Sequence, residues 1–545
     1  MPSPETSSAI RDDKRSSSPA GDRAQRNANA RWLNFLIPST TDLIFVLLLG
    51  AFAAGPLAQR LLGDAGIGWH IRTGLQDDLT GAVPRVDPFS TTMQGQPWYA
   101  WEWLYDTVVG WIERIAGLNG VVFANAFVIA ATLALVFRRM IARGTGLIVA
   151  VVLALLAVFA SSIHFLARPH VVSWLLTVAC FEIFRDFELD GRTTRLLWFP
   201  AIMLVWANVH GGFMVGLALL GFFLIAAILQ SILGRSPELR TGGIRRTKAL
   251  AVVALASGLV TFANPYGYRL HEHIYRYLTD RFLMDHIDEF LSPNFHGAAQ
   301  KCFAAIILLT IATVAISRRK ICVSEFLVIA FAVYSGLYAA RNIPVASLLL
   351  VLIIGPRLSA AIQTSAAEGK LSARGDSLLV RFGGFEGRMR TQEIARRGHW
   401  LAVASIVLGA WTCGHAGRLG AAQVMNANFD PKRFPVQAVE WLEKQPSRGP
   451  VFCPDWWGGY LIYRAYPNLK AVVDDRHDLY GAEYFKQYLK IVRVEPGWDQ
   501  ALTETHAEWL LLPSHSAAAT LMREVPAWSS AYSDETAAVF QRGTK

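Results

Sequence analysis

The chain has 545 residues, of which 53% are hydrophobic and 17% are charged, with a formal net charge of +10. Soluble globular proteins carry about a quarter charged residues, so this composition excludes a protein that exists in water alone. Apolar runs of roughly 17–25 residues, the length an α-helix needs to cross a bilayer, recur along the chain. The sequence therefore predicts a multi-pass membrane protein with helical spans.

The positive charge does not indicate nucleic-acid binding. The basic residues cluster in short hydrophilic links between apolar segments, the distribution that membrane topology requires. The five cysteines are odd in number and lie mostly in or beside apolar segments, so no disulfide framework is expected.

The first 41 residues are rich in Ser, Arg and Asp, and they predict a disordered cytoplasmic tail. The membrane domain is expected over residues 42–424, with about eleven transmembrane helices. They are predicted at Asp42–Leu57, Leu118–Phe137, Gly146–Ile163, Val171–Phe184, Leu196–Val209, Phe213–Leu233, Ala249–Phe262, Phe303–Ile316, Glu325–Ala340, Ile343–Leu358 and Trp400–His415.

Topology follows from the placement of Lys and Arg. With a cytoplasmic amino terminus, five cytoplasmic links are all basic, whereas the opposite links carry few basic residues for their length. The basic links are Arg138–Arg143, Arg185–Arg195, Gly234–Lys248, Ser317–Lys320 and Arg357–Arg397. An odd number of spans then places the rest of the chain outside the cytoplasm.

Residues 425–545 differ from the membrane domain because they are polar and contain turn signals. Short β-branched or apolar runs predict strands at Gly449–Asp455, Leu469–Arg476 and Ala507–Pro513. Amphipathic patterns predict helices within Phe434–Gln445 and Ala482–Val492. Since strands and helices alternate, we expect a small α/β domain on the extracytoplasmic side.

Polar clusters interrupt the apolar sequence, and all of them fall on the predicted outer side. Ionisable groups near membrane depth are costly and commonly mark a functional cavity. We therefore expect one site assembled there from Gly63–His70, Trp98–Asp106, His164–His170, Trp206–Gly212, Asn264–His273, Asp285–His296 and Ala339–Pro344.

Arg168 and Arg341 each end a span on the side where Arg is disfavoured, and a guanidinium there suits a phosphate, which it can hold bidentately. Asp64 is the first acid outside the membrane. Glu102, together with Asp87, Asp288 and Glu289, provides the other candidates for a base or a metal ligand.

Several of these features also have structural interpretations. Trp69, Trp98, Trp101 and Trp103 would suit an interfacial aromatic belt equally well. The "NPYG" segment at 264–267 is commonly a helix stop and turn, and a single His is commonly an interfacial residue with satisfied hydrogen bonds. For Arg168 the structural and phosphate-binding interpretations are evenly balanced.

The motif order "GD…GWHIRTG…GAVPRVDPFS…PWYAWEWL", "ARPH", "WANVHGG", "NPYG" and "RNIP" resembles a group of bacterial integral-membrane proteins of the GT-C glycosyltransferase superfamily. The resemblance implies a GT-C-like membrane fold in the bacterial inner membrane. It implies an inverting enzyme that passes a sugar from a polyprenyl-phosphate donor to a glycan, lipid or protein acceptor outside the cytoplasm.

Carried over to this chain, the resemblance implies that Asp64 is the catalytic base. Glu102 is the second residue that we expect to be catalytic. Arg341 and Arg168 would neutralise the leaving lipid phosphate. Further contacts to substrate are expected from His70, His170, Asn208, His210, Asn264, Tyr266 and Asp288.

The sequence leaves open whether a divalent metal ion serves as a cofactor. The group's first loop often has the pattern D-x-D, which suits Mg²⁺ or Mn²⁺, but here Gly66 stands in place of the second acid and weakens such a site. Trp101 also replaces a His that commonly precedes the Glu-Trp pair. These two departures predict either a metal-independent enzyme or a chain whose activity is reduced or lost.

The segment Val451–Arg476 is similar to the "WWDYG" region of the oligosaccharyltransferase catalytic subunit, which binds an acceptor peptide. The resemblance implies that Trp456 and Trp457 face an acceptor, although Gly458 replaces the acid of that motif. The alternative is that both tryptophans pack this domain against the membrane part.

Two other classes of function compete with a transferase. A transporter or lipid flippase would also have many spans and buried arginines, but it needs a path to both membrane faces and commonly an internal repeat. A catalytically silent scaffold would keep the frame and display the tail domain, and Gly66 and Trp101 favour it.

Overall fold

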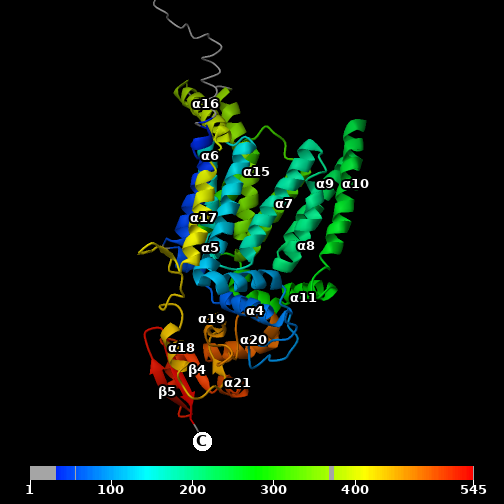
Figure 1. Ribbon diagram of the computed structural model, residues 1–545. Helices are drawn as coiled ribbons and strands as arrows, with labels where there is room; N and C mark the ends of the chain where they lie inside the picture. The colour runs from blue at the N-terminus through cyan, green and yellow to red at the C-terminus, as the bar shows by residue number, and fades with distance from the viewer. Residues whose placement is uncertain (1–31, 33, 56, 368–372, 544–545) are drawn as a thin grey trace, which may run out of the picture.

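The computed structural model describes residues 32, 34–55, 57–367 and 373–543. A long helical bundle carries a small sheet-containing domain at one end (Figure 1). Most of the predicted amino-terminal tail, residues 1–31, lies outside the described residues.

All eleven predicted spans are helical, which confirms the helical membrane-type bundle. These helices are α2 (Thr40–Ala53), α5 (Trp103–Ala142), α6 (Leu147–Ser161), α7 (His170–Asp190), α8 (Phe199–Val209), α9 (Phe213–Leu233), α10 (Pro237–Val260), α13 (Ala298–Ile316), α14 (Val323–Tyr338), α15 (Ile343–Ala367) and α17 (Trp400–Gly414).

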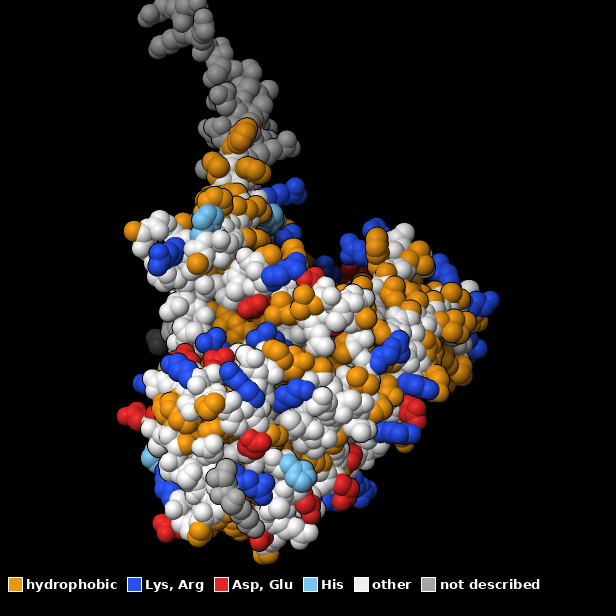
Figure 2. Space-filling model, turned by 60° about the horizontal axis from the view of Figure 1, so that its bottom comes forward, with side chains coloured by type: hydrophobic (Ala, Val, Ile, Leu, Met, Phe, Trp, Pro, Cys, Tyr) orange, Lys and Arg blue, Asp and Glu red, His pale blue; other side chains and the backbone are white. Residues whose placement is uncertain are grey.

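Within the described residues, six helical segments are long and apolar enough to cross a membrane, and they contain α2, α5, α6, α9, α13 and α15. The shorter apolar segments contain α8, α14 and α17. Leu255, Leu308 and Val407 on the outside of the bundle are each more than 60% exposed, and hydrophobic side chains gather over the helices at the right of Figure 2. Such a surface requires lipid, so the protein is a multi-pass membrane protein.

Helix α5 begins well before the span predicted at Leu118–Phe137, and it contains a break just before that span. Gly117 has a φ of 60°, which breaks the helix into two segments. The first segment, from Trp103, packs against α4 (Gly66–Thr80), and the second is the apolar span.

The end of the bundle farthest from the sheet is closed by α16 (Ala373–Ala395) (Figure 1). A buried ion network lies near this end, where Glu325 pairs with Arg185 and Arg357. Arg185 and Arg357 belong to links that the sequence predicts to be cytoplasmic, and Glu325 is the first residue of a predicted span.

The carboxyl-terminal domain is built on a four-stranded sheet of order β3-β4-β6-β5, in which only β3 and β4 are parallel. Two of the predicted strands form, whereas Leu469–Arg476 contributes only isolated bridges at Ala471. The hairpin β5–β6 was not predicted. The strands are β3 (Val451–Phe452), β4 (Trp509–Pro513), β5 (Trp528–Ser533) and β6 (Ala537–Arg542), after a small ribbon of β1 (Arg418–Leu419) and β2 (Ala422–Gln423).

Five helices complete this domain: α18 (Val436–Leu442), α19 (Asp455–Ala465), α20 (His477–Arg493), α21 (Trp498–Glu504) and α22 (Ala517–Met522). Between the bundle and the domain lie α4 and α11, as Figure 1 shows. The remaining short elements of the bundle's links are α3 (Ala58–Leu61), α11 (Tyr268–Thr279), α12 (Arg281–His286), η1 (Ser162–His164), η2 (Leu196–Trp198), η3 (Asp288–Phe290) and η4 (Ala340–Asn342).

Glycines let α4 and α19 approach each other closely. A Cβ added at Gly68 would lie 2.2 Å from the Gly459 carbonyl oxygen, and one added at Gly459 would lie 2.3 Å from the Ala65 carbonyl oxygen. Because real Cβ atoms do not approach other atoms so closely, these positions require glycine. The link between α2 and α5, which contains α4, therefore packs backbone against backbone with the carboxyl-terminal domain.

Arg476 fixes the same contact electrostatically. Its guanidinium donates to both oxygens of Asp474 at 2.7 Å and to Asp87 of the α2–α5 link at 2.8 Å. The ring of Trp98 lies 4.6 Å from the guanidinium carbon. Arg476 is 2% exposed and both acids are buried, so this buried ion triad joins the loop to the domain.

We predict that Arg476→Ala destabilises the junction by about 3–5 kcal/mol, because it leaves two buried carboxylates without their cation. Thermal unfolding in detergent and limited proteolysis of the 83–100 loop would measure this effect. The control is Arg493→Ala, which removes a half-exposed guanidinium from the same domain. Equal stability of the two variants would contradict the role of Arg476.

Candidate functional site

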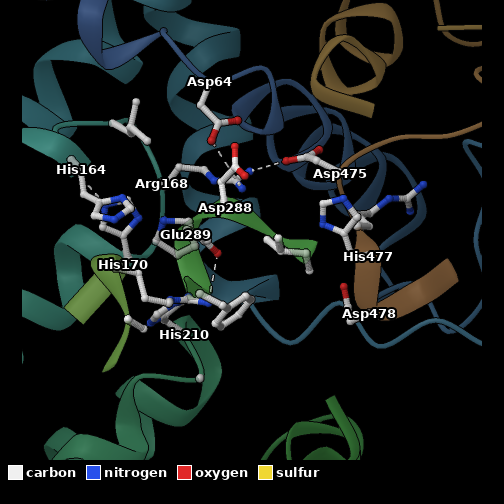
Figure 3. Close-up of a pocket in the computed structure, with 18 of the residues that line it drawn as sticks. Asp64, His164, Arg168, His170, His210, Asp288, Glu289, Asp475, His477 and Asp478 are labelled. Atoms are coloured by element: carbon white, nitrogen blue, oxygen red, sulfur yellow. Dashed lines mark hydrogen bonds and ion pairs between the residues drawn. The ribbon is translucent and has the colours of Figure 1, made fainter. Parts of the chain in front are cut away.

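A cavity of about 1340 Å³ lies at the junction between the bundle and the carboxyl-terminal domain. Its walls come from the α2–α5 link, the ends of α7, α9 and α14 nearest the carboxyl-terminal domain, the α12–η3 segment and the carboxyl-terminal domain. Nine of the thirteen predicted site residues line it, namely Asp64, His70, Glu102, Arg168, His170, His210, Asp288, Arg341 and Trp456. Figure 3 shows most of the polar groups converging there.

Arg168 lies between two carboxylates that come from distant parts of the chain. Its Nη1 donates to Asp475 Oδ2 at 3.0 Å, and its Nη2 lies 3.7 Å from Asp64 Oδ2. In Figure 3 the two acids lie on either side of the guanidinium. Burial lowers the pKa of Arg168 but the two acids raise it by more, so its net pKa lies above the ordinary value and it stays charged.

Asp475 has further contacts in the cavity wall. Its Oδ1 accepts a hydrogen bond from the Trp69 indole at 3.0 Å. Burial raises the pKa of Asp475 to about 7, against the opposing effect of Arg168. This carboxylate is therefore held by two donors from the membrane part, although it belongs to the other domain.

Asp64 is oriented by its own loop. Its Oδ1 accepts a hydrogen bond from the Gly66 backbone at 2.8 Å, a local turn that fixes the carboxylate direction. The other oxygen faces Arg168. Asp64 thus presents a positioned carboxylate at the cavity wall.

Arg341 provides a second cationic group in the cavity wall. Its Nη1 lies 3.1 Å from Glu289 Oε1, and its guanidinium carbon lies 4.5 Å from the centre of the Phe290 ring. Burial raises the pKa of Glu289, but the charges of Arg341 and Arg168 outweigh it and lower the pKa to about 2. Both guanidinium groups therefore act on one carboxylate within the same cavity.

His210 has a defined tautomer. Its Nδ1 accepts a hydrogen bond from the Gly212 backbone at 3.0 Å and lies 2.8 Å from Ser173 Oγ, whose oxygen already accepts from Trp206. Nδ1 is thus an acceptor, which leaves the hydrogen on Nε2. Burial lowers the pKa of His210 to about 3, so His210 is a neutral N–H donor.

Glu102 is buried against the cavity, and its Oε2 has no hydrogen-bond partner among the described residues. Burial, reinforced by Asp478, raises the pKa of this carboxyl well above its ordinary value. The raised pKa favours the protonated form of Glu102, which suits a hydrogen-bond donor better than a base.

Two other predicted residues have local partners. His70 Nδ1 lies 2.6 Å from Asp106 Oδ1, and its ring lies against Trp69. His170 Nε2 lies 3.0 Å from the His164 carbonyl oxygen. Asp288 lines the cavity beside Glu289, and Trp456 is 53% exposed.

Four predicted site residues lie outside this cavity. Asn208 accepts from Trp103 and donates to two carbonyls, which ties α5, α8 and the 263 turn together. Asn264 closes the "NPYG" turn, and Tyr266 bonds to Pro84 and Ala100. Trp457 is buried and donates to the Arg433 carbonyl at 2.9 Å.

The "VVDDRHD" segment brings lining residues that the sequence analysis did not single out. Asp475, His477 and Asp478 all line the cavity. His477 Nε2 lies 2.8 Å from Asp455 Oδ2, and Asp478 lies 2.9 Å from His273. The signal in the sequence that could have identified these residues is the high density of charged residues directly after a predicted buried strand.

Gly458, which stands where the "WWDYG" motif has its acid, is fixed by packing. A Cβ at this position would lie 2.5 Å from the Asp474 Cα. An acid there would displace the segment that carries Asp475 and Arg476. The departure from the motif is thus a requirement of this structure.

The residues present do not fit a Mg²⁺ or Mn²⁺ ion. Such ions bind about six oxygen ligands with near-octahedral geometry. Asp64 and Asp475 both face the Arg168 guanidinium. Across the described residues, no group of three His, Cys, Asp or Glu side chains is arranged to hold a metal ion.

Comparisons of the sequence with protein-family models and with curated proteins find no match. Among solved structures, the chain is similar to the Archaeoglobus fulgidus oligosaccharyltransferase in the apo form, with 10% identity and a TM-score of 0.48, covering 87% of this chain and 69% of that chain. The same enzyme tethered to an acceptor peptide has 10% identity, the same coverage and a TM-score of 0.49.

The chain is also similar to ArnT from Cupriavidus metallidurans bound to undecaprenyl phosphate, with 14% identity and a TM-score of 0.46, covering 91% of this chain and 97% of that chain. Both neighbours are GT-C glycosyltransferases, the superfamily that the sequence motifs resemble. Because the identities are low and the TM-scores are below 0.5, the function proposed next rests on the geometry of the cavity.

Proposed function

We propose that this protein is a GT-C-type membrane glycosyltransferase, which moves a sugar from a polyprenyl-phosphate donor to an acceptor hydroxyl. The observation that carries the proposal is one large cavity that combines a positioned carboxylate, Asp64, with two guanidinium groups, Arg168 and Arg341. Transfer needs a base on one side of the anomeric carbon and charge stabilisation on the other.

The reaction is a single displacement. The acceptor oxygen attacks the anomeric carbon, and its proton passes to Asp64. The bond between that carbon and the phosphate oxygen breaks, and the phosphate leaves with the electron pair. Attack opposite the leaving group inverts the anomeric centre.

The leaving phosphate is stabilised by donors of the bundle. Arg341 offers a guanidinium that suits phosphate geometry. His210 offers an Nε2–H, since its Nδ1 is already an acceptor. A phosphate would compete with Glu289 for Arg341, and the protonated Glu102 adds a further donor in the same cavity.

The acceptor enters along the carboxyl-terminal domain. Trp456 offers an exposed aromatic face, and His477 and Asp478 add polar groups on the same wall. These groups suit a hydroxyl-bearing glycan, a lipid head group or a protein side chain. The donor tail reaches the cavity from the membrane lipid around the bundle.

The proposal includes eleven spans in a bacterial inner membrane, with a cytoplasmic amino terminus. The five basic links and the helical character of all eleven segments support this arrangement. It places the cavity and the carboxyl-terminal domain on the extracytoplasmic side, where polyprenyl-phosphate sugars would be used.

We predict that Asp64→Asn lowers sugar transfer by about 10²–10⁴-fold, because the amide cannot take the proton. Purified protein, a labelled polyprenyl-phosphate sugar and product chromatography would measure it. Asp78→Asn is the matched control, since Asp78 pairs with Arg114 away from the cavity. Full activity of the Asp64 variant would refute the assignment of Asp64 as the base. If the native chain flips the donor lipid without transferring its sugar, the result would favour a flippase.

We predict that Glu102→Gln keeps transfer within about tenfold of the native rate, whereas Glu102→Ala loses more, because the native group is neutral and acts as a donor. The native rate should show no dependence on Glu102 ionisation near neutral pH, since the pKa of this carboxyl is raised. Steady-state kinetics of both variants from pH 6 to 8 test this. A Gln variant as inactive as the Ala variant would indicate an ionised Glu102.

A further inference from the structure

Three charged residues of the cavity, which come from both domains, place one guanidinium between two carboxylates. Asp64 comes from the first outer loop, Arg168 from the segment before α7, and Asp475 from the carboxyl-terminal domain. Two carboxylates facing each other across a small gap repel unless a cation lies between them. In this chain that cation is a side chain.

The Arg168 guanidinium occupies the space that a side chain at position 66 would take. A Cβ at position 66 would lie 1.5 Å from Arg168 Nη1 and 2.4 Å from Asp475 Oδ2. Any side chain there would take the space of the guanidinium and push it away from Asp475. Gly66 is therefore the residue that leaves room for the arginine.

The second carboxylate of the arrangement comes instead from the other domain. Asp475 reaches Arg168 because its neighbour Arg476 is anchored in the buried triad with Asp87 and Asp474. Asp475 is also held by the Trp69 indole. A carboxylate with two fixed donors is positioned before any substrate binds.

A guanidinium differs from a divalent ion in ways that suit this position. It is always charged at physiological pH, and its planar donors can reach two acids at once. It needs no further ligands, whereas Mg²⁺ or Mn²⁺ would need about six oxygens, which the described residues do not supply as a cluster.

We propose that Arg168 is a built-in cation, which holds Asp64 and Asp475 together in the place of a divalent metal ion. This inference rests on the proposed glycosyl transfer and deepens it. Transfer then requires no metal, and Asp475 is a positioning residue that the carboxyl-terminal domain contributes to the base.

The test removes the side-chain cation and asks whether a metal ion takes its place. Mn²⁺ binding is followed by electron paramagnetic resonance on the full-length chain in detergent. The native chain should bind no Mn²⁺ in the cavity, and Arg168→Ala should bind one per chain. Adding Asp475→Asn or Asp64→Asn to that variant should weaken Mn²⁺ binding at least about tenfold.

Arg72→Ala is the matched control, because Arg72 bonds to the Tyr463 carbonyl at 2.7 Å and no carboxylate pair would be exposed. It should bind no Mn²⁺. Should Arg168→Ala fail to fold, Arg168→Gln replaces it with the same expectations. The proposal would be overturned if the native chain binds Mn²⁺ and Asp475→Asn removes this binding. It would also be overturned if the Arg168 variant binds no Mn²⁺.

A second arm uses turnover. Native transfer should remain within about twofold in EDTA, and Mn²⁺ should partly restore transfer by Arg168→Ala, by at least about tenfold. Loss of native transfer in EDTA with recovery in Mg²⁺ or Mn²⁺ would overturn the proposal. The resonance measurement needs no turnover, so it tests the role of Arg168 independently of activity. The absence of any sugar transfer would therefore refute the proposed function and not the role of Arg168.

Discussion

The structure depends on the buried triad of Asp87, Arg476 and Asp474. Two buried carboxylates without a cation would be strongly destabilising, so the loop and the domain that carry them remain together. Asp87 and Arg476 are 389 positions apart in the chain. Because Asp475 and His477 flank Arg476, anchoring this one side chain places both neighbours in the cavity wall.

The glycines of the α2–α5 link serve the same contact. Gly68 lets the backbone of α19 approach α4, and Gly66 leaves space for Arg168 beside Asp475. The acid that precedes them in "GDAGIGWH", Asp64, is then oriented by the Gly66 backbone. This segment is therefore a shaped part of the cavity wall, which explains its unusual composition for a connection between helices.

Much of the helical architecture could be predicted because lipid imposes long apolar helices with basic links. The C-terminal hairpin β5–β6 was missed because its sequence has little regular alternation, and Leu469–Arg476 was predicted as a strand although only Ala471 bridges. In the cavity, charged residues next to spans were recognised because their burial is costly. Asp475 was not, because pairing across hundreds of positions leaves no local pattern, and Asn208 and Trp457 were predicted as binding residues although their polar groups bond within the fold.

The central claim is that the site is assembled across the two parts of the chain, with Asp475 facing Asp64 through Arg168. The most direct measurement is a cryo-EM structure of the full chain in lipid nanodiscs. The account predicts Asp475 within about 4 Å of the Arg168 guanidinium, the distance of an ion pair, and the carboxyl-terminal domain packed against the α2–α5 link. A map in which Asp475 faces bulk solvent and Arg168 pairs elsewhere would contradict it.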